Sequence, residues 1–380
     1  FGYYEQYKSR QALVAYGFKG STLTSDLIRR KYLRNDFFGG VYALNYKQGR
    51  WEASLGGAMN HYNGRHFGTL VSVINPTVTN YPDTEYYRNK AEKDENSFYG
   101  KLNYEVGKGL NAYVDLQYRH INYRIQNPDD KYSTAQTEGW RYDEHYNFFN
   151  PKAGLFWQIN PNHALYGSWA ISHREPVRND FEGNPDPKPR AERMNDWELG
   201  YKYQSETFSG GVNFYHMTYK DQFVLTGEIS ATGEMIHQNV GNSYRQGIEL
   251  QGAWKPIDWF RWDANATFSR NRAKDWTVKS DNKKPLNFGT THLSFSPDVI
   301  FNNIFTFDYH GFAAALQSQY IGEQYMTNDN NRNLMLDGYF VSNLDLSYSF
   351  KLKSIKQVSV GATIYNLFSK KYFSNGHASA

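Results

Sequence analysis

Short segments of strict apolar–polar alternation recur along this 380-residue chain and constrain its fold more than any other feature. Residues 197–204 have the sequence Trp-Glu-Leu-Gly-Tyr-Lys-Tyr-Gln, and residues 343–350 have the sequence Asn-Leu-Asp-Leu-Ser-Tyr-Ser-Phe. Side chains on a strand point alternately to its two faces, so each segment has one apolar and one polar face. The chain is therefore predicted to be all-β. Further segments of this kind lie at 38–46, 98–105, 112–119 and 248–254.

Composition excludes several other classes of protein. Aromatic residues reach 17% of the chain, which excludes a disordered chain. The absence of cysteine excludes disulfide frameworks and thiolate-bound metal centres. Lys and Arg number 42 against 38 Asp and Glu, so no nucleic-acid partner is expected. No run of about 18 apolar residues exists, which excludes a transmembrane helix. An aromatic-rich chain of low hydropathy is typical of a transmembrane antiparallel β-barrel with a polar lumen.

The connections between the alternating segments favour the barrel over a water-soluble β-sandwich, which also alternates. Short turns alternate with long polar stretches along the chain. Outer-membrane barrels show the same alternation, because their periplasmic turns are short and their extracellular loops are long. A sandwich gives no reason for this pattern. The predicted turns are 48–50, 106–109, 160–163, 255–258 and 309–312, and the predicted long loops are 62–95, 126–145 and 174–193.

The alternation predicts about fifteen strands. Because single-chain bacterial barrels have an even number of strands, we interpret residues 1–380 as one partial barrel domain, truncated at both ends and without its final strand. The predicted strands lie near 3–16, 35–47, 51–61, 96–106, 111–125, 146–158, 164–173, 194–204, 207–219, 240–255, 259–271, 292–308, 312–323, 338–351 and 356–367.

Several motifs follow one another in a fixed order. The first motif combines residues 149–155 with 168–176, the second combines 184–189 with 197–200, and the third combines 239–241 with 247–250. The fourth comprises residues 360–372, and residues 25–31 form a further motif near the start of the chain. In order and spacing they resemble the TonB-dependent outer-membrane receptors, particularly those of the Bacteroides type. The second motif departs from the family pattern, with Pro187 in place of Leu and Arg190 in place of Glu.

The resemblance implies a barrel of about 22 strands with an N-terminal plug and a TonB box, neither of which is in these 380 residues. It implies a bacterial outer-membrane location and energy-coupled import of a large scarce ligand, with a ferric siderophore as the favoured cargo. The partners would be TonB, the ligand and outer-membrane lipid. No enzymatic activity and no cofactor are expected. The alternatives are a cobalamin or haem importer of the same architecture, a passive porin, and a non-transport barrel scaffold.

Arg and aromatic residues in the predicted loops and upper strand ends are the candidate ligand contacts. Arg pairs with carboxylate or hydroxamate-type oxygens and stacks on planar groups, while Tyr offers a flat apolar face with one polar tip. The alternative is that they only pack the girdle and loops. The predicted substrate-binding residues are Tyr62, Arg65, His66, Trp140, Arg141, Arg174, Arg178, Tyr244 and Arg245.

No catalytic constellation or resident metal site is predicted. His61 and His66 could ligate iron or haem together, although two solvated histidines at a loop tip are the favoured interpretation. Residues 328–331 resemble a calcium loop without its terminal Glu and are interpreted as a turn. A stretch of acidic residues could bind a calcium ion that orders the loop, although a charged and soluble loop without an ion is the favoured interpretation. Its members are Asp83, Glu85, Glu92, Asp94 and Glu95.

Overall fold

A computed structural model describes residues 2–12, 24–74, 84–127, 140–183, 188–229, 235–279 and 285–377. The chain divides into two compact units, which are treated separately below. Unit 1 comprises residues 1–46, 53–101 and 116–149, and unit 2 comprises residues 47–52, 102–115 and 150–380. Among the described residues, no helix is long and apolar enough to cross a membrane.

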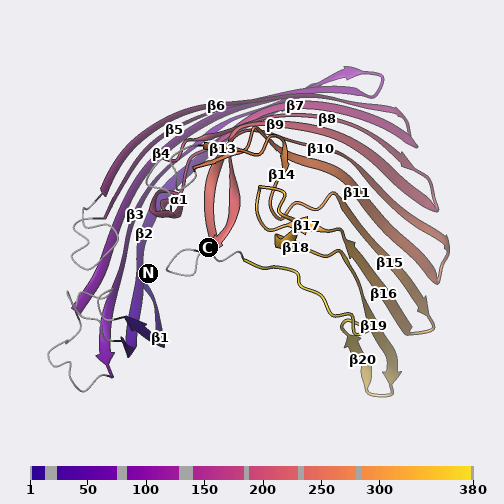
Figure 1. The fold of residues 1–380 in the computed structure, drawn as a ribbon. Coiled ribbons are helices and arrows are strands. Elements are labelled where there is room, and N and C mark those ends of the chain that lie inside the picture. The colour runs from indigo at the N-terminus through magenta and orange to yellow at the C-terminus, as the bar shows by residue number, and fades with distance from the viewer. Residues whose placement is uncertain are drawn as a thin grey trace. The chain divides into compact units, whose positions relative to one another are not determined.

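Fifteen of the described strands follow one another in chain order along one sheet (Figure 1). They are β1 (Gly2–Ala12), β2 (Thr24–Gln48), β3 (Trp51–Val73), β4 (Thr84–Gly107), β5 (Leu110–Asn127), β6 (Trp140–Asn160), β7 (His163–Arg174), β8 (Glu192–Gln204), β9 (Phe208–Ile229), β10 (Met235–Ile257), β11 (Phe260–Lys274), β15 (Val299–Tyr309), β16 (Phe312–Ile321), β19 (Tyr339–Leu352) and β20 (Ile355–Ile364). The shorter elements are β14 (Thr291–His292) beside β11, the pair β12 (Thr277–Lys279) and β13 (Pro285–Asn287), the pair β17 (Gln324–Tyr325) and β18 (Met335–Leu336), helix α1 (Arg178–Gly183) and the 3-10 helix η2 (Arg332–Leu334).

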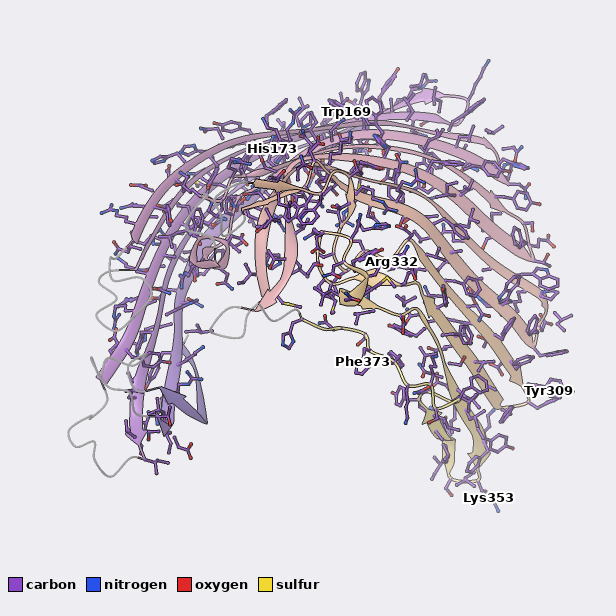
Figure 2. All side chains as sticks on the ribbon, viewed as in Figure 1. Trp169, His173, Tyr309, Arg332, Lys353 and Phe373 are labelled. Carbon is purple, nitrogen blue, oxygen red and sulfur yellow. The ribbon has the colours of Figure 1, made fainter. Side chains whose placement is uncertain are left out.

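The predicted all-β fold, the number of strands and the five tight turns are confirmed. Residues 13–16 of the first predicted strand lie outside the described residues, and the strand predicted at 292–308 begins only at Val299. The turn between β15 and β16 shows how two residues are enough to reverse the chain between adjacent strands. Its two central residues, His310 and Gly311, have φ of 49° and 83°. Positive φ at both positions matches the twist of a two-residue hairpin. Figure 2 labels Tyr309 at this turn.

The prediction of a long loop at 62–95 is wrong, because most of it is strand. β3 continues to Val73 and β4 begins at Thr84. Residues 140–145 of the loop predicted at 126–145 also belong to a strand, β6, while 128–139 lie outside the described residues. Apolar alternation ends where the lipid ends, whereas backbone pairing needs no apolar side chain and continues beyond it.

The sheet of unit 2 has one apolar face and one polar face, as the alternation predicts. On β10, Ile248, Leu250 and Trp254 share the apolar face and are 37–43% exposed. Glu249 and Gln251 lie between them and point to the opposite face. The apolar row continues across neighbouring strands, because Leu250 lies opposite both Val212 of β9 and Ala266 of β11. Apolar side chains exposed over several strands are suited to contact with lipid.

Packing within unit 2 is concentrated near one end of the strands. A buried cluster there comprises Val224, Val240, Ala273, Trp276 and Leu293. The pair β17–β18 lies on the concave face of the curved unit 2 sheet (Figure 1). Connections between strands therefore fold back over the sheet, and they meet the ends of β9, β10 and β11.

Candidate ligand-binding surface

Arg174, Glu192 and Phe223 meet where β7, β8 and β9 come together. Arg174 and Glu192 lie directly opposite each other, with Nη2 and Oε2 3.6 Å apart. The Arg174 guanidinium lies 5.2 Å from the centre of the Phe223 ring. The Phe223 amide donates to Glu192 Oε2 at 2.8 Å. The Arg174 side chain is still 55% exposed, so its guanidinium can accept a further anion.

Arg245 of β10 adds a second cation on the same polar face. Its Nη1 donates to Ser296 Oγ at 3.1 Å. Tyr215, Tyr219 and Glu192 lie near enough to act electrostatically on the Arg245 guanidinium. Arg174 and Arg245 thus both lie near the Glu192 carboxylate and beside aromatic rings. Such a surface suits a bulky ligand that carries anionic oxygens.

Helix α1, which occupies part of the loop predicted at 174–193, lies beside this surface and contacts β10. The Val177 amide donates to Asp180 Oδ2 at 2.8 Å, so the Asp180 side chain reaches back to cap the first turn. Asp180 is buried, and its Oδ1 lies 3.9 Å from His237 Nδ1. Arg178, predicted to bind ligand, is also buried in this helix. Burial raises the pKa of the Asp180 carboxyl, although the Val177 amide, His237 and Arg174 oppose the rise.

Because its folded-state pKa is raised, Asp180 favours α1 most at a pH below its ordinary pKa of 3.8. That contribution is lost as the pH rises through the folded-state pKa. Asp180→Asn keeps an acceptor for the Val177 amide and stays neutral, so hydrogen-exchange protection of α1 should no longer fall over this range. Asp180→Ala removes the acceptor and should weaken α1 by about 1 kcal/mol at every pH. Equal protection in the two variants would contradict the capping role.

The loops that flank the surface are held by a network of amide side chains. Asn328 accepts from the Ser294 amide and donates to the Leu225 carbonyl, both at 2.8 Å. Asn330 Oδ1 accepts from the His292 amide at 2.8 Å. The stretch 328–331, which sequence analysis interpreted as a turn, therefore ties the β16–β19 loop to the β11–β15 loop and to β9. Among the described residues, no group of three or more His, Cys, Asp or Glu could hold a metal ion.

In unit 1, two predicted ligand contacts meet at Asn35 of β2. Its Oδ1 accepts from the Tyr62 hydroxyl at 2.9 Å and lies 3.2 Å from His66 Nε2. His61 instead lies 2.6 Å from Asp94 Oδ1, with its Nδ1 facing that oxygen. His61 and His66 are five positions apart on one strand and so point to opposite faces. They cannot ligate one iron together, and neither lies at a loop tip.

Arg65 alternates with Tyr62 and His66 and so points to the other face of β3. Arg141 is exposed on β6, with Nη2 4.0 Å from Asp143 Oδ2. Trp140 opens the same strand, and its side chain lies outside the described part. These residues belong to unit 1, whereas Arg174, Arg178, Tyr244 and Arg245 belong to unit 2.

Tyr244 and Arg245 are neighbours in sequence but lie on opposite faces of β10. Tyr244 shares the apolar face with Ile248, and Lys274 Nζ lies 5.5 Å from the centre of its ring. A ligand on the polar face can therefore contact Arg245 but not the Tyr244 ring.

The predicted acidic loop is a strand with paired charges. Four of its residues lie on β4, and Asp83 lies outside the described residues. Each of the four has a basic partner, which offsets the repulsion between neighbouring carboxylates. The pairs are Glu85 with Arg88, Glu92 with Lys90, Asp94 with His61, and Glu95 with Arg119.

Three residues at this surface were not predicted from the sequence, namely Glu192, Phe223 and Ser296. Glu192 carried a usable signal, because it lies at the far end of the loop predicted at 174–193 and has the charge opposite to that of Arg174. Phe223 and Ser296 carried none, because their roles depend on strand register and on how the β11–β15 loop folds back.

Residues 1–367 match the family described as TonB dependent receptor-like, beta-barrel. The chain belongs to this family. It lies in the bacterial outer membrane, as the members of this family do. A pesticin receptor from Yersinia enterocolitica is 22% identical over 194 residues, which is 50% of this chain and 27% of that protein.

Solved structures show the same fold. The ferric yersiniabactin uptake receptor from Yersinia pestis superposes with a TM-score of 0.68 at 13% identity, covering 99% of this chain and 54% of that one. A ferric citrate transporter in its unliganded form superposes with a TM-score of 0.67 at 14% identity, covering 99% of this chain and 55% of that one. The chain thus spans about half the length of these structures and about a quarter of the pesticin receptor.

Proposed function

We propose that the protein containing this chain imports a ferric siderophore across the outer membrane and draws its energy from TonB. Residues 1–380 would act as one barrel domain that supplies the membrane-spanning wall and part of the ligand-binding surface. The proposal involves no bond-making step, so it needs no catalytic residue in this chain.

The observation that carries the proposal is the cluster of Arg174, Glu192 and Arg245 on the polar face of unit 2. The guanidinium groups of Arg174 and Arg245 lie near the Glu192 carboxylate and beside the rings of Phe223 and Tyr219. Ferric chelates present oxygens of negative charge and often flat aromatic or amide groups. Guanidinium and aromatic groups recognise both features.

Two relatives support this class of ligand. One of the superposed receptors is described as taking up ferric yersiniabactin, and another as transporting ferric citrate. The opposite orientations of His61 and His66 do not favour a bis-histidine haem site in unit 1.

Ligand-binding titrations on the intact protein test the cargo. Fluorescence quenching would be measured with a ferric catecholate, a ferric hydroxamate, ferric citrate, cobalamin and haem as separate probes. One ferric chelate is expected to bind at least about tenfold more tightly than cobalamin or haem, since charge-assisted contacts distinguish the anionic complex. Tighter binding of cobalamin or haem would overturn the ferric assignment.

Uptake assays in cells test the energy source. Uptake of the bound ferric chelate is expected to stop when TonB is deleted or the proton gradient is collapsed. A strain lacking the intact receptor is the control for background uptake. Uptake that continues without TonB would indicate a passive porin, and binding without any uptake would indicate a non-transport scaffold.

A further inference from the structure

The apolar face of unit 2 contains a hollow of about 680 Å³ near the ends of β7 and β8. It lies at the end of the strands where the long 175–191 connection begins, which is the extracellular end in barrels of this kind. Figure 2 labels Trp169 of β7, which forms part of its wall. The lining residues that point to this face are Trp169, Ile171, Arg193, Asn195, Trp197, Thr218, Lys220, Asn242 and Lys274.

Three cations form a row across the upper edge of the hollow. Arg193 of β8 lies directly opposite Lys220 of β9, Lys220 lies opposite Asn242 of β10, and Asn242 lies opposite Lys274 of β11. Adjacent strands are about 4.8 Å apart, so the row spans about 15 Å. The side chains of the three cations and of Asn242 are all exposed.

These cations lack acidic partners within the part of the chain that the structure describes. None of the three forms an ion pair there, and Lys274 contacts the ring of Tyr244 instead. The nearby Arg272 is already paired with Asp298. Arg193 and Lys220 are like charges directly opposite each other, an arrangement that destabilises a sheet unless an anion lies between them. Asn195, Thr218 and Asn242 add neutral hydrogen-bonding groups to the same hollow.

Below the cations the surface becomes aromatic and then aliphatic. The rings of Trp169 and Trp197 lie 6.0 Å apart, which matches the aromatic girdle at a membrane interface. The next row towards the bilayer centre contains Leu199, Phe214 and Ile248, which lie opposite one another in register and are exposed. A molecule on this surface would therefore have an anionic head above the girdle and apolar chains below it.

We propose that the hollow binds the phosphate-bearing headgroup of an outer-leaflet glycolipid. Arg193, Lys220 and Lys274 contact the phosphates, and the Trp169–Trp197 pair supports the sugar and the first acyl carbons. The acyl chains run along Leu199, Phe214 and Ile248. The glycolipid supplies the negative charge that the Arg193–Lys220 pair lacks.

Native mass spectrometry of the intact receptor in detergent tests the proposal, with bisphosphorylated lipid A as the probe. The test variant combines Arg193→Gln, Lys220→Gln and Lys274→Gln. The wild-type protein is expected to retain the lipid, and the variant is expected to bind it at least about tenfold more weakly, since each cation near an anionic surface contributes to affinity. Dephosphorylated lipid A is expected to bind both proteins equally and weakly.

The matched control neutralises three lysines at the turn between β19 and β20, with Lys351→Gln, Lys353→Gln and Lys356→Gln. All three are exposed, and Figure 2 labels Lys353. The control should bind lipid A as the wild type does. Heat-modifiable gel migration checks that each variant is folded, and the single variant Lys220→Gln, with a smaller loss, replaces the triple variant if that fails. Unchanged lipid A binding in the test variant would overturn the proposal. Displacement of lipid A by inorganic phosphate would show a free-phosphate site and would also overturn it.

Discussion

Replacing Leu250 with Arg is expected to lower the free energy of unfolding of the intact protein by about 2–4 kcal/mol, the cost of an Arg near the bilayer midplane on the lipid face of a barrel. Leu250 lies between Ile248 and Trp254 on the apolar face, and both strand neighbours opposite it, Val212 and Ala266, are apolar. The guanidinium would have no polar partner there. Denaturant titration of the protein folded into lipid vesicles measures the change.

Gln251→Arg is the matched control, because the same side chain is introduced one position further on and points to the polar face. Gln251 is exposed on that face, where Asp263 and Asn265 lie nearby. Its substitution should change the unfolding free energy by less than about 0.5 kcal/mol, as is usual for surface positions. Equal losses in the two variants would mean that the two faces do not differ in environment. The lipid-facing assignment would then be wrong.

Arg245→Gln is expected to weaken binding of the ferric ligand by roughly 10- to 100-fold, since a hydrogen bond to a charged group contributes about 1.5–3 kcal/mol. The substitution also removes a nearby positive charge from Glu192, which keeps its ion pair with Arg174. The remaining charge on the carboxylate would repel an anionic ligand. Fluorescence titration of the intact receptor with the ferric chelate measures the effect.

The control for this prediction is Arg261→Gln, which removes a guanidinium from the polar face at the far end of β11. Arg261 is paired with Asp263, two positions along the same strand. Ligand affinity should be unchanged in this variant. A similar loss of affinity in both variants would indicate a general effect of net charge, and unchanged affinity in Arg245→Gln would remove Arg245 from the binding surface.

The alternation of residue types predicted the number of strands, their order and the tight turns. Each is a local property, because the side-chain period of a strand is two and a tight turn involves only adjacent residues. The ends of the strands were predicted poorly. β3 and β4 extend far into the stretch predicted to be a loop, where charged pairs such as Glu85–Arg88 replace apolar contacts.

The candidate site was predicted only in part. Arg174 and Arg245 were recognised by residue type, but Glu192, which lies near both, was not, because β7 to β10 must be placed in register before these residues come together. Parity along β10 already implied that Tyr244 and Arg245 point to opposite faces, although both were proposed as ligand contacts. Helix α1 was also missed, since its one capping turn is too short to produce a helical pattern.

The sequence by itself determined that this chain is a set of two-faced strands joined by tight turns, because side-chain direction on a strand depends only on position parity. Only the tertiary structure decided which side chains meet. The Arg174–Glu192–Arg245 cluster and the row of Arg193, Lys220 and Lys274 each depend on the register of several strands. Register is a non-local property, since it is set by hydrogen bonds between segments that are distant along the chain.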